Sequence, residues 1–172
     1  YKFFEEGRSN IFLSLNPRYR FSNKFNLRYG LLYNPSYKEQ GFVDTDGDDI
    51  IFGQRDRLTI ENSIGGDYIF NNKISLNLTF RHYYSGAMYS KLYSLEQNGE
   101  LTEEPERENI YDVTFNTWNL DLKFAWWFAP GSQITVLYRN ALDSYLQESG
   151  QTINENINYL FNQPQLNSIS VR

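Results

Sequence analysis

The chain has no cysteine, a single histidine and no long hydrophobic run. Without cysteine it forms no disulfides and has no thiolate ligands, and one histidine leaves no material for histidine-rich metal chemistry. No stretch reaches the roughly 20 apolar residues that a membrane helix needs, so a helical membrane protein is excluded. The net charge of −5 makes a nucleic-acid partner unfavourable, and none is expected. A glycine-rich phosphate loop and a Gly-x-Ser-x-Gly elbow are also missing, so no catalytic residue and no enzyme activity are predicted.

Aromatic side chains and alternating apolar and polar residues are abundant instead. Aromatic residues make up 17% of the chain, and strict alternation occurs in segments such as 25–33, 74–80 and 118–126. Alternation with period two places apolar side chains on one face of a strand and polar ones on the other. The polar face carries full charges in mid-strand, which a dry core would not accept. The pattern predicts an all-β fold, a transmembrane antiparallel up-and-down β-barrel in the bacterial outer membrane, with lipid outside and water inside.

The links between the expected strands alternate between short and long. Short turns are expected near 22–24, 71–72 and 129–132, and long loops near 38–54, 85–109 and 143–164. Outer-membrane barrels have short periplasmic turns and longer outer loops, so we assign the links accordingly. The third long loop contains apolar residues at helical spacing, which predicts a short helix; these are Ile153, Ile157, Leu160 and Phe161.

About seven strands are expected, whereas single-chain bacterial barrels usually have an even number from eight upward. We therefore interpret residues 1–172 as a single barrel domain that is a C-terminal part of a larger barrel, with further strands before residue 1.

The expected inward face of the strands is polar and carries both signs of charge. Its members are Asn26, Arg28, Thr59, Glu61, Asp67, Asn77, Arg81, Asn119, Asp121 and Lys123. Cross-strand ion pairs of Arg28 or Arg81 with Glu61 are predicted. Two interpretations are open, a water-filled pore and a lumen closed by paired charges or a plug.

One acidic cluster is a calcium candidate, formed by Asp44, Asp46, Asp48 and Asp49 around a glycine. Alternating carboxylates can wrap Ca²⁺, but Arg55 stands where a calcium loop has its last, bidentate acid. A solvated acidic loop is the alternative, and no other cofactor is expected. The acidic run at 100–108 contains Glu103 and Glu104, which could supply a carboxylate pair for glycosidase chemistry or form a flexible loop.

Several segments resemble a known family, namely 50–57, 80–85, 115–121, the Ala-Pro-Gly-Ser turn of 127–132, and 138–140. The chain resembles the C-terminal outer-membrane domain of unknown function that follows a carbohydrate-binding family 9-like domain in Gram-negative bacterial proteins. The resemblance covers most of the chain, from about Asn10 onward. It implies a barrel linked to a glycan-binding module outside these residues, and an aromatic-rich final strand after Arg172. It implies no catalytic residues.

The expected role is that of an outer-membrane barrel acting as an anchor, a transporter or a component of a complex. Its expected partners are outer-membrane lipid, other outer-membrane or surface proteins, and glycan bound by the upstream module. One alternative is the barrel of a carbohydrate-active, hydrolase-type surface protein. Another is a soluble all-β binding protein, in which the apolar face would point inward.

Overall fold

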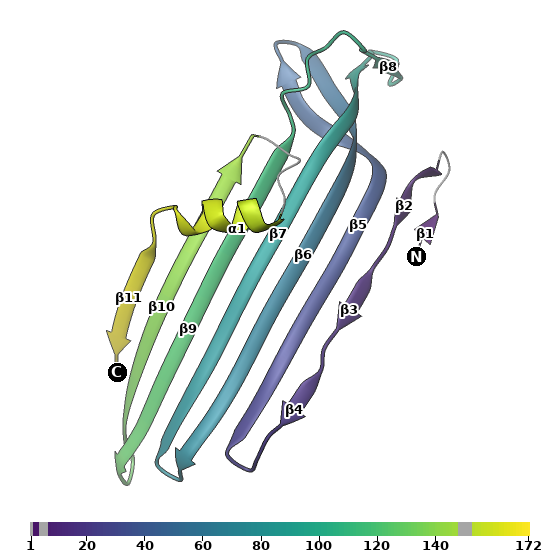
Figure 1. Cartoon of the computed structure of the whole chain (residues 1–172). Helices are drawn as coiled ribbons and strands as arrows, with labels where there is room; N and C mark the ends of the chain where they lie inside the picture. The colour runs from purple at the N-terminus through teal and green to yellow at the C-terminus, as the bar shows by residue number, and fades with distance from the viewer. Residues whose placement is uncertain (1, 4–6, 148–152) are drawn as a thin grey trace.

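The computed structural model describes residues 2–3, 7–147 and 153–172. Long antiparallel strands that follow one another in the chain lie side by side in one sheet (Figure 1). These are β5 (Phe25–Asp46), β6 (Asp49–Asn71), β7 (Ile74–Leu95), β9 (Val113–Ala129) and β10 (Ser132–Leu146). The sheet order β1-β2-β5-β6-β7-β9-β10-β11 is up-and-down and antiparallel. The predicted all-β, up-and-down architecture is confirmed.

The shorter elements lie at the edges of this sheet and at its ends. They are β1 (Lys2–Phe3), β2 (Ser9–Asn10), β3 (Leu13–Leu15), β4 (Arg18–Arg20), β8 (Leu101–Glu103), α1 (Ile153–Phe161) and β11 (Leu166–Val171). β2, β3 and β4 all pair with β5 and together form one interrupted strand beside it. Pro17 lies in the gap between β3 and β4, and a proline removes a ladder hydrogen bond, which an edge strand tolerates.

The links at one end of the sheet are short, close to the expected positions. Only residues 72–73 separate β6 from β7, and the Asn71 side chain accepts hydrogen bonds from the backbone N–H of Lys73 (2.8 Å) and Ile74 (3.0 Å). Residues 130–131 separate β9 from β10, and Gly131 supplies a φ of 72°. Such turns need the left-handed region that glycine reaches without steric cost.

The expected loops at the opposite end are largely strand. In the loop expected at 38–54, β5 continues to Asp46 and β6 begins at Asp49, so this segment is a hairpin closed by Gly47 and Asp48. In the loop expected at 85–109, β7 continues to Leu95 and pairs with β8. Apolar residues stand next to one another in the first of these segments, as in Ile50-Ile51-Phe52, so it lacks the alternation that marks a half-buried strand.

The third expected loop, at 143–164, begins inside β10 and contains the predicted helix, α1, at Ile153–Phe161. Its middle, residues 148–152, lies outside the described residues. In the described part of the chain, no helix is long and apolar enough to cross a membrane.

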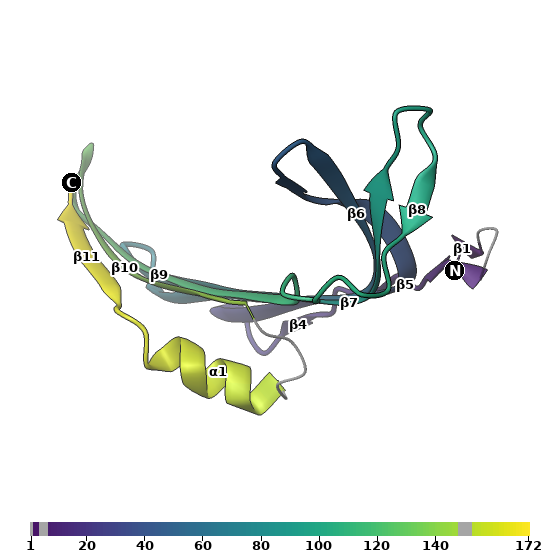
Figure 2. The ribbon, with the colours of Figure 1, turned by 90° about the horizontal axis from the view of Figure 1, so that it is seen from above.

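The sheet is curved, and its two faces differ in chemistry (Figure 2). Cross-strand partners share a face, so the register carries the alternation of each strand across the whole sheet. One such row joins Leu27, Gly66, Leu78 and Leu122. In 25–37, 58–70, 74–88, 114–128 and 134–146, no position on this face is Asp, Glu, Lys or Arg. The helix α1 contacts this apolar face, and Figure 2 shows α1 on the convex side of the sheet.

Polar side chains on the convex face form a network at the level of α1. The Tyr29 hydroxyl donates to Asn62 (2.8 Å), and His82 Nε2 lies 2.8 Å from Asn116 Oδ1. Asn116 is fully buried and donates to the backbone oxygen of Asn156 in α1 (3.4 Å). His82 is therefore a buried structural residue that the network holds. The helix α1 covers polar groups that the apolar face would otherwise expose.

The two edges of the sheet lie apart in space. β11 forms one edge, with Leu166, Ile169 and Val171 each 65% exposed or more. The strands β1 to β4 form the other edge (Figure 1). Within the described residues no strand pairing joins these edges, so the sheet is open.

Candidate functional site: the charged concave face

The concave face carries the mid-strand charges. The register places on this one face all ten inward residues expected from the alternation. It also adds Arg18 and Arg20 from the edge strand, and Arg139 and Asp143 from β10. Both signs of charge are present, and Figure 2 shows the sheet curving around its concave side, opposite α1. This face is the candidate site because it gathers charged groups from six strands, β4, β5, β6, β7, β9 and β10.

Two ion pairs organise the middle of the face, and neither is the predicted pair with Glu61. Arg28 contacts Asp67 (2.7 Å), which also accepts a hydrogen bond from Asn77 (2.6 Å). Arg28 lies opposite Gly65, so Asp67 is its diagonal neighbour, whereas Glu61 lies four residues farther along β6. On the other side of the face, Asp121 accepts two hydrogen bonds from Arg139, at 2.7 and 3.3 Å, from its direct cross-strand partner.

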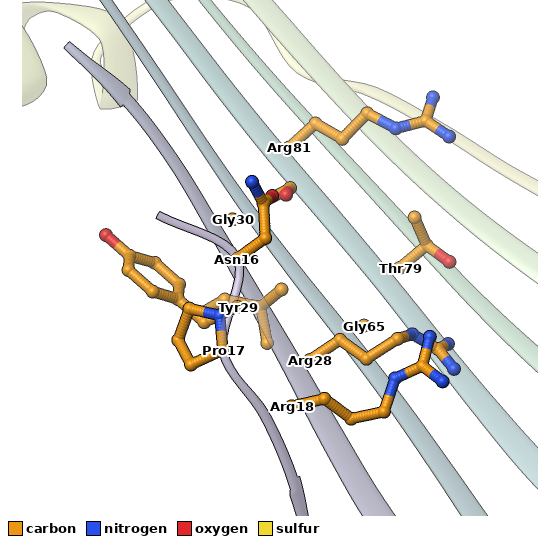
Figure 3. A pocket seen from close by; sticks show the side chains of 11 residues that line it. Asn16, Pro17, Arg18, Arg28, Tyr29, Gly30, Gly65, Thr79 and Arg81 are labelled. Carbon is orange, nitrogen blue, oxygen red and sulfur yellow. The ribbon is translucent and has the colours of Figure 1, made fainter. Parts of the chain in front are cut away.

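A cavity of about 380 Å³ opens beside the break between β3 and β4 (Figure 3). Three arginines line it: Arg18 from β4, Arg28 from β5 and Arg81 from β7. Figure 3 shows the Arg18 and Arg28 side chains reaching toward the same side of the cavity, with Thr79 beyond them. No carboxylate is among the lining residues, so the cavity is cationic.

A second cluster of charged side chains links β5 to β6 where their hairpin begins. Glu39 accepts hydrogen bonds from Arg57 (2.8 and 3.1 Å) and from Arg55 (3.1 Å). Arg55 also donates to the Tyr89 hydroxyl (2.7 Å), which ties β6 to β7. Sequence alternation does not reveal this cluster, because the pairing of 39 with 55 depends on a register shift between Ser36 and Glu39.

The expected calcium loop is the tip of the β5–β6 hairpin. Arg107, from the segment that follows β8, contacts this tip. Arg107 lies 3.2 Å from Asp46, 3.6 Å from Asp49 and 2.5 Å from Glu104. Among the residues that the structure describes, no group of three or more acidic, histidine or cysteine side chains is placed to hold a metal ion. The calcium site at Asp44, Asp46, Asp48 and Asp49 stays a prediction; Arg107 supplies positive charge to two of these residues, Asp46 and Asp49.

The carboxylates considered for glycosidase chemistry are likewise held by cations. Glu103 contacts Lys91 (2.8 Å), and Glu104 contacts Arg107 and accepts a short hydrogen bond from Ser94. Arg107 therefore joins the β7–β8 hairpin to the tip of the β5–β6 hairpin. Both hairpins bend toward the concave side of the sheet (Figure 2).

We expect this connection to weaken in acid, because the Glu104 carboxylate holds the Arg107 side chain in the position from which it contacts Asp46 and Asp49. The hydrogen bond from Arg107 holds the pKa of the Glu104 carboxyl below its usual value, and Ser94 acts in the same direction. Because the pKa of Glu104 is lower in the folded state, its contact with Arg107 is fully stabilising above the pKa of the unfolded state, about 4.3. This stabilisation is lost as the pH falls through the pKa of the folded state. Spin labels on Thr45→Cys and Thr102→Cys should keep one separation from pH 8 to 5 and move apart as the pH falls below the unfolded pKa of Glu104.

The absence of native cysteine makes this double labelling specific. As a control, Arg107→Gln should show the larger separation already at pH 7. An unchanged separation from pH 7 to 3 in the unmodified background would contradict the proposed electrostatic origin of the connection.

The fold and the site define a class of protein: an antiparallel up-and-down sheet whose convex face is free of charge along most of its long strands and whose concave face is charged. The family model described as Domain of unknown function (DUF5916) matches residues 1–172, so the chain belongs to this family. No match was found among curated proteins or among solved structures.

Proposed function

We propose that this chain forms part of the wall of an outer-membrane β-barrel, with its convex face toward lipid and its concave face toward an aqueous lumen. One observation carries the proposal: over 25–37, 58–70, 74–88, 114–128 and 134–146 the register keeps charge off the convex side of the sheet and gathers it on the concave side. A sandwich or soluble barrel buries an apolar inner face and exposes polar residues outside. Here the curvature places the apolar face outside, as in membrane barrels.

Aromatic side chains mark the limits of the apolar band. Near the short turns, Phe25 stacks on Phe21 (ring centroids 4.9 Å apart) and Tyr68 packs against Phe70 (4.7 Å). Tyr33 lies eight residues along β5 from Phe25, which is roughly 27 Å of strand at about 3.4 Å per residue. A tilted transmembrane strand has about 9–11 residues, so the segment from Phe25 to Tyr33 is long enough to cross an apolar band with aromatic girdles at both ends. The short turns would then face the periplasm, and the long hairpins the outside.

The open edges indicate that more strands complete the proposed barrel. In a bilayer, an unpaired strand edge leaves backbone N–H and C=O groups without partners, which costs several kcal/mol per group. β11 and the β2–β4 edge therefore need pairing with strands outside residues 1–172. We propose that the complete barrel anchors a carbohydrate-binding module at the outer membrane, either as a transporter or within a surface complex.

The test is to express the full-length protein and fractionate the cell envelope. We expect it in the outer-membrane fraction, and expect its migration on a cold gel to differ from that after boiling, as a closed barrel resists detergent. A protein that stays in solution without detergent, with the same migration in both conditions, would contradict the proposal and favour a soluble all-β binding protein.

A further inference from the structure

Two arginines lie directly opposite one another on the concave face. Arg18 of β4 and Arg28 of β5 are cross-strand partners. Like charges in this position destabilise a strand pair unless a counter-charge is near. Asp67 neutralises Arg28 at 2.7 Å. In the described residues, by contrast, no carboxylate forms an ion pair with Arg18.

The floor of the cavity beside this pair is a glycine. A Cβ at Gly65 would lie 3.0 Å from Arg28 Nε and 3.1 Å from Arg28 Nη2, closer than ordinary side-chain contacts. The Arg28 guanidinium thus lies across the place where a side chain at position 65 would stand. Gly65 keeps this space open, and the guanidinium is exposed to the cavity from the side of Arg18 (Figure 3).

The third arginine has no carboxylate directly opposite it. Arg81 lies opposite Ser63 on one side and Asn119 on the other. Asp121, two residues along β9 from Asn119, already accepts both hydrogen bonds of Arg139. Positive charge is therefore in excess at the cavity, which Asn16 and Thr79 line with further polar groups.

We propose that this cavity binds the oxyanion group of a solute in the lumen, a carboxylate, sulfate or phosphate. Guanidinium groups present planar pairs of N–H donors that match such groups, and charged hydrogen bonds of this kind are stronger than neutral ones. A volume of about 380 Å³ lies in the range of small-molecule sites, so a solute of monosaccharide size fits. The inference rests on the proposed function in one respect, that the concave face is open to water.

The test is a calorimetric titration of the full-length protein, purified in detergent, with sodium glucuronate, and with glucose as the uncharged comparison. Separate titrations with inorganic sulfate and phosphate distinguish an acidic sugar from a free oxyanion. We expect glucuronate or an inorganic oxyanion to bind, glucose not to bind, and affinity to fall as NaCl is raised.

The decisive variant is Arg18→Gln, with Arg20→Gln as its matched control. Arg20 lies on the same strand and face, but binds Ser22 and Asn23 in the turn and does not line the cavity. Loss of a charged hydrogen bond should weaken oxyanion binding about tenfold or more in Arg18→Gln and leave it unchanged in Arg20→Gln. Without oxyanion, Arg18→Gln should melt at a higher temperature than the unmodified protein, since it removes a like-charge contact.

Gly65→Ala supplies a second variant that changes no charge. Its Cβ displaces the Arg28 guanidinium and should also weaken oxyanion binding. Equal affinity of all three variants, or no binding of any oxyanion, would overturn this inference. The boiled and unboiled migration of the same preparation tests the barrel separately, so a heat-modifiable protein without oxyanion binding refutes the site alone.

Discussion

An arginine at position 31 should destabilise the folded protein strongly, whereas the same arginine at position 32 should be tolerated. Leu31 lies on the convex face, opposite Asn62, and Leu32 lies on the concave face, opposite Glu61. Both side chains are partly buried in the sheet, so the two substitutions are matched in residue type, position and exposure. They differ in the face that receives the charge.

The expected difference follows from the solvent on each side. An arginine that faces the lipid core costs about 2–4 kcal/mol near the bilayer midplane and less toward its surface. On the concave side, Leu32→Arg places a cation directly opposite an exposed carboxylate, and such a pair contributes a few tenths of a kcal/mol up to about 1 kcal/mol. The free energy of unfolding, from urea titration of full-length protein in lipid vesicles, should fall for Leu31→Arg and stay nearly constant for Leu32→Arg.

A lower free energy of unfolding for Leu32→Arg than for Leu31→Arg would show that the concave face is a dry core. In that arrangement Leu32→Arg would bury a charge beside packed side chains, and Leu31→Arg would place it in water. The heat-modifiable fraction on a gel gives a second reading of the same pair of variants, and should fall for Leu31→Arg alone.

The contrast between Leu31 and Leu32 also shows what the sequence predicts, namely the face of the sheet on which each residue lies. A shift of one residue reverses the face of every side chain in a strand, so alternation alone assigned all ten polar residues to one face correctly. Partners within that face depend on register, which alternation does not determine. Arg28 was therefore expected to pair with Glu61, although the register places Asp67 within reach.

Contacts between segments far apart in the sequence were also missed. Arg107 lies in an acidic run, where its own sequence neighbours predict only a solvated loop. Its contacts with Asp46 and Asp49 join segments about 60 residues apart, and arise because both hairpins bend toward the same side. The two arginines of β4 follow the alternation that begins in β3, because the register to β5 continues unchanged past Pro17 and places Arg18 and Arg20 on the polar face.

The helix α1 was predicted from its apolar spacing, but its position was not. Leu160 is fully buried, and Phe161 packs against Trp118 with ring centroids 5.0 Å apart. The helix lies over Asn116 and His82, which bond to each other on a face that is otherwise apolar. We infer that the polar network and the helix depend on one another. The buried Asn116 and His82 side chains need hydrogen-bond partners, and α1 both accepts a hydrogen bond from Asn116 and shields the pair.

We therefore expect Leu160→Ala to release α1 from the sheet. Removal of a fully buried leucine side chain costs about 2–5 kcal/mol, which exceeds what the few remaining contacts of a nine-residue helix supply. Amide hydrogen exchange in α1 should become fast, and Trp118 fluorescence should change as Phe161 moves away. Exchange in the strands near the short turns should stay slow.

The matched control is Tyr159→Ala, one residue away on the same helix, where the side chain is 37% exposed. Its effect on the free energy of unfolding should be within about 0.5 kcal/mol, as is usual for surface positions. If both variants leave α1 protected, the helix is held by its backbone contact with Asn116 and not by Leu160. If both release it, the exposed side of α1 also makes contacts, and a lipid surface or a further strand of the barrel would lie against Tyr159.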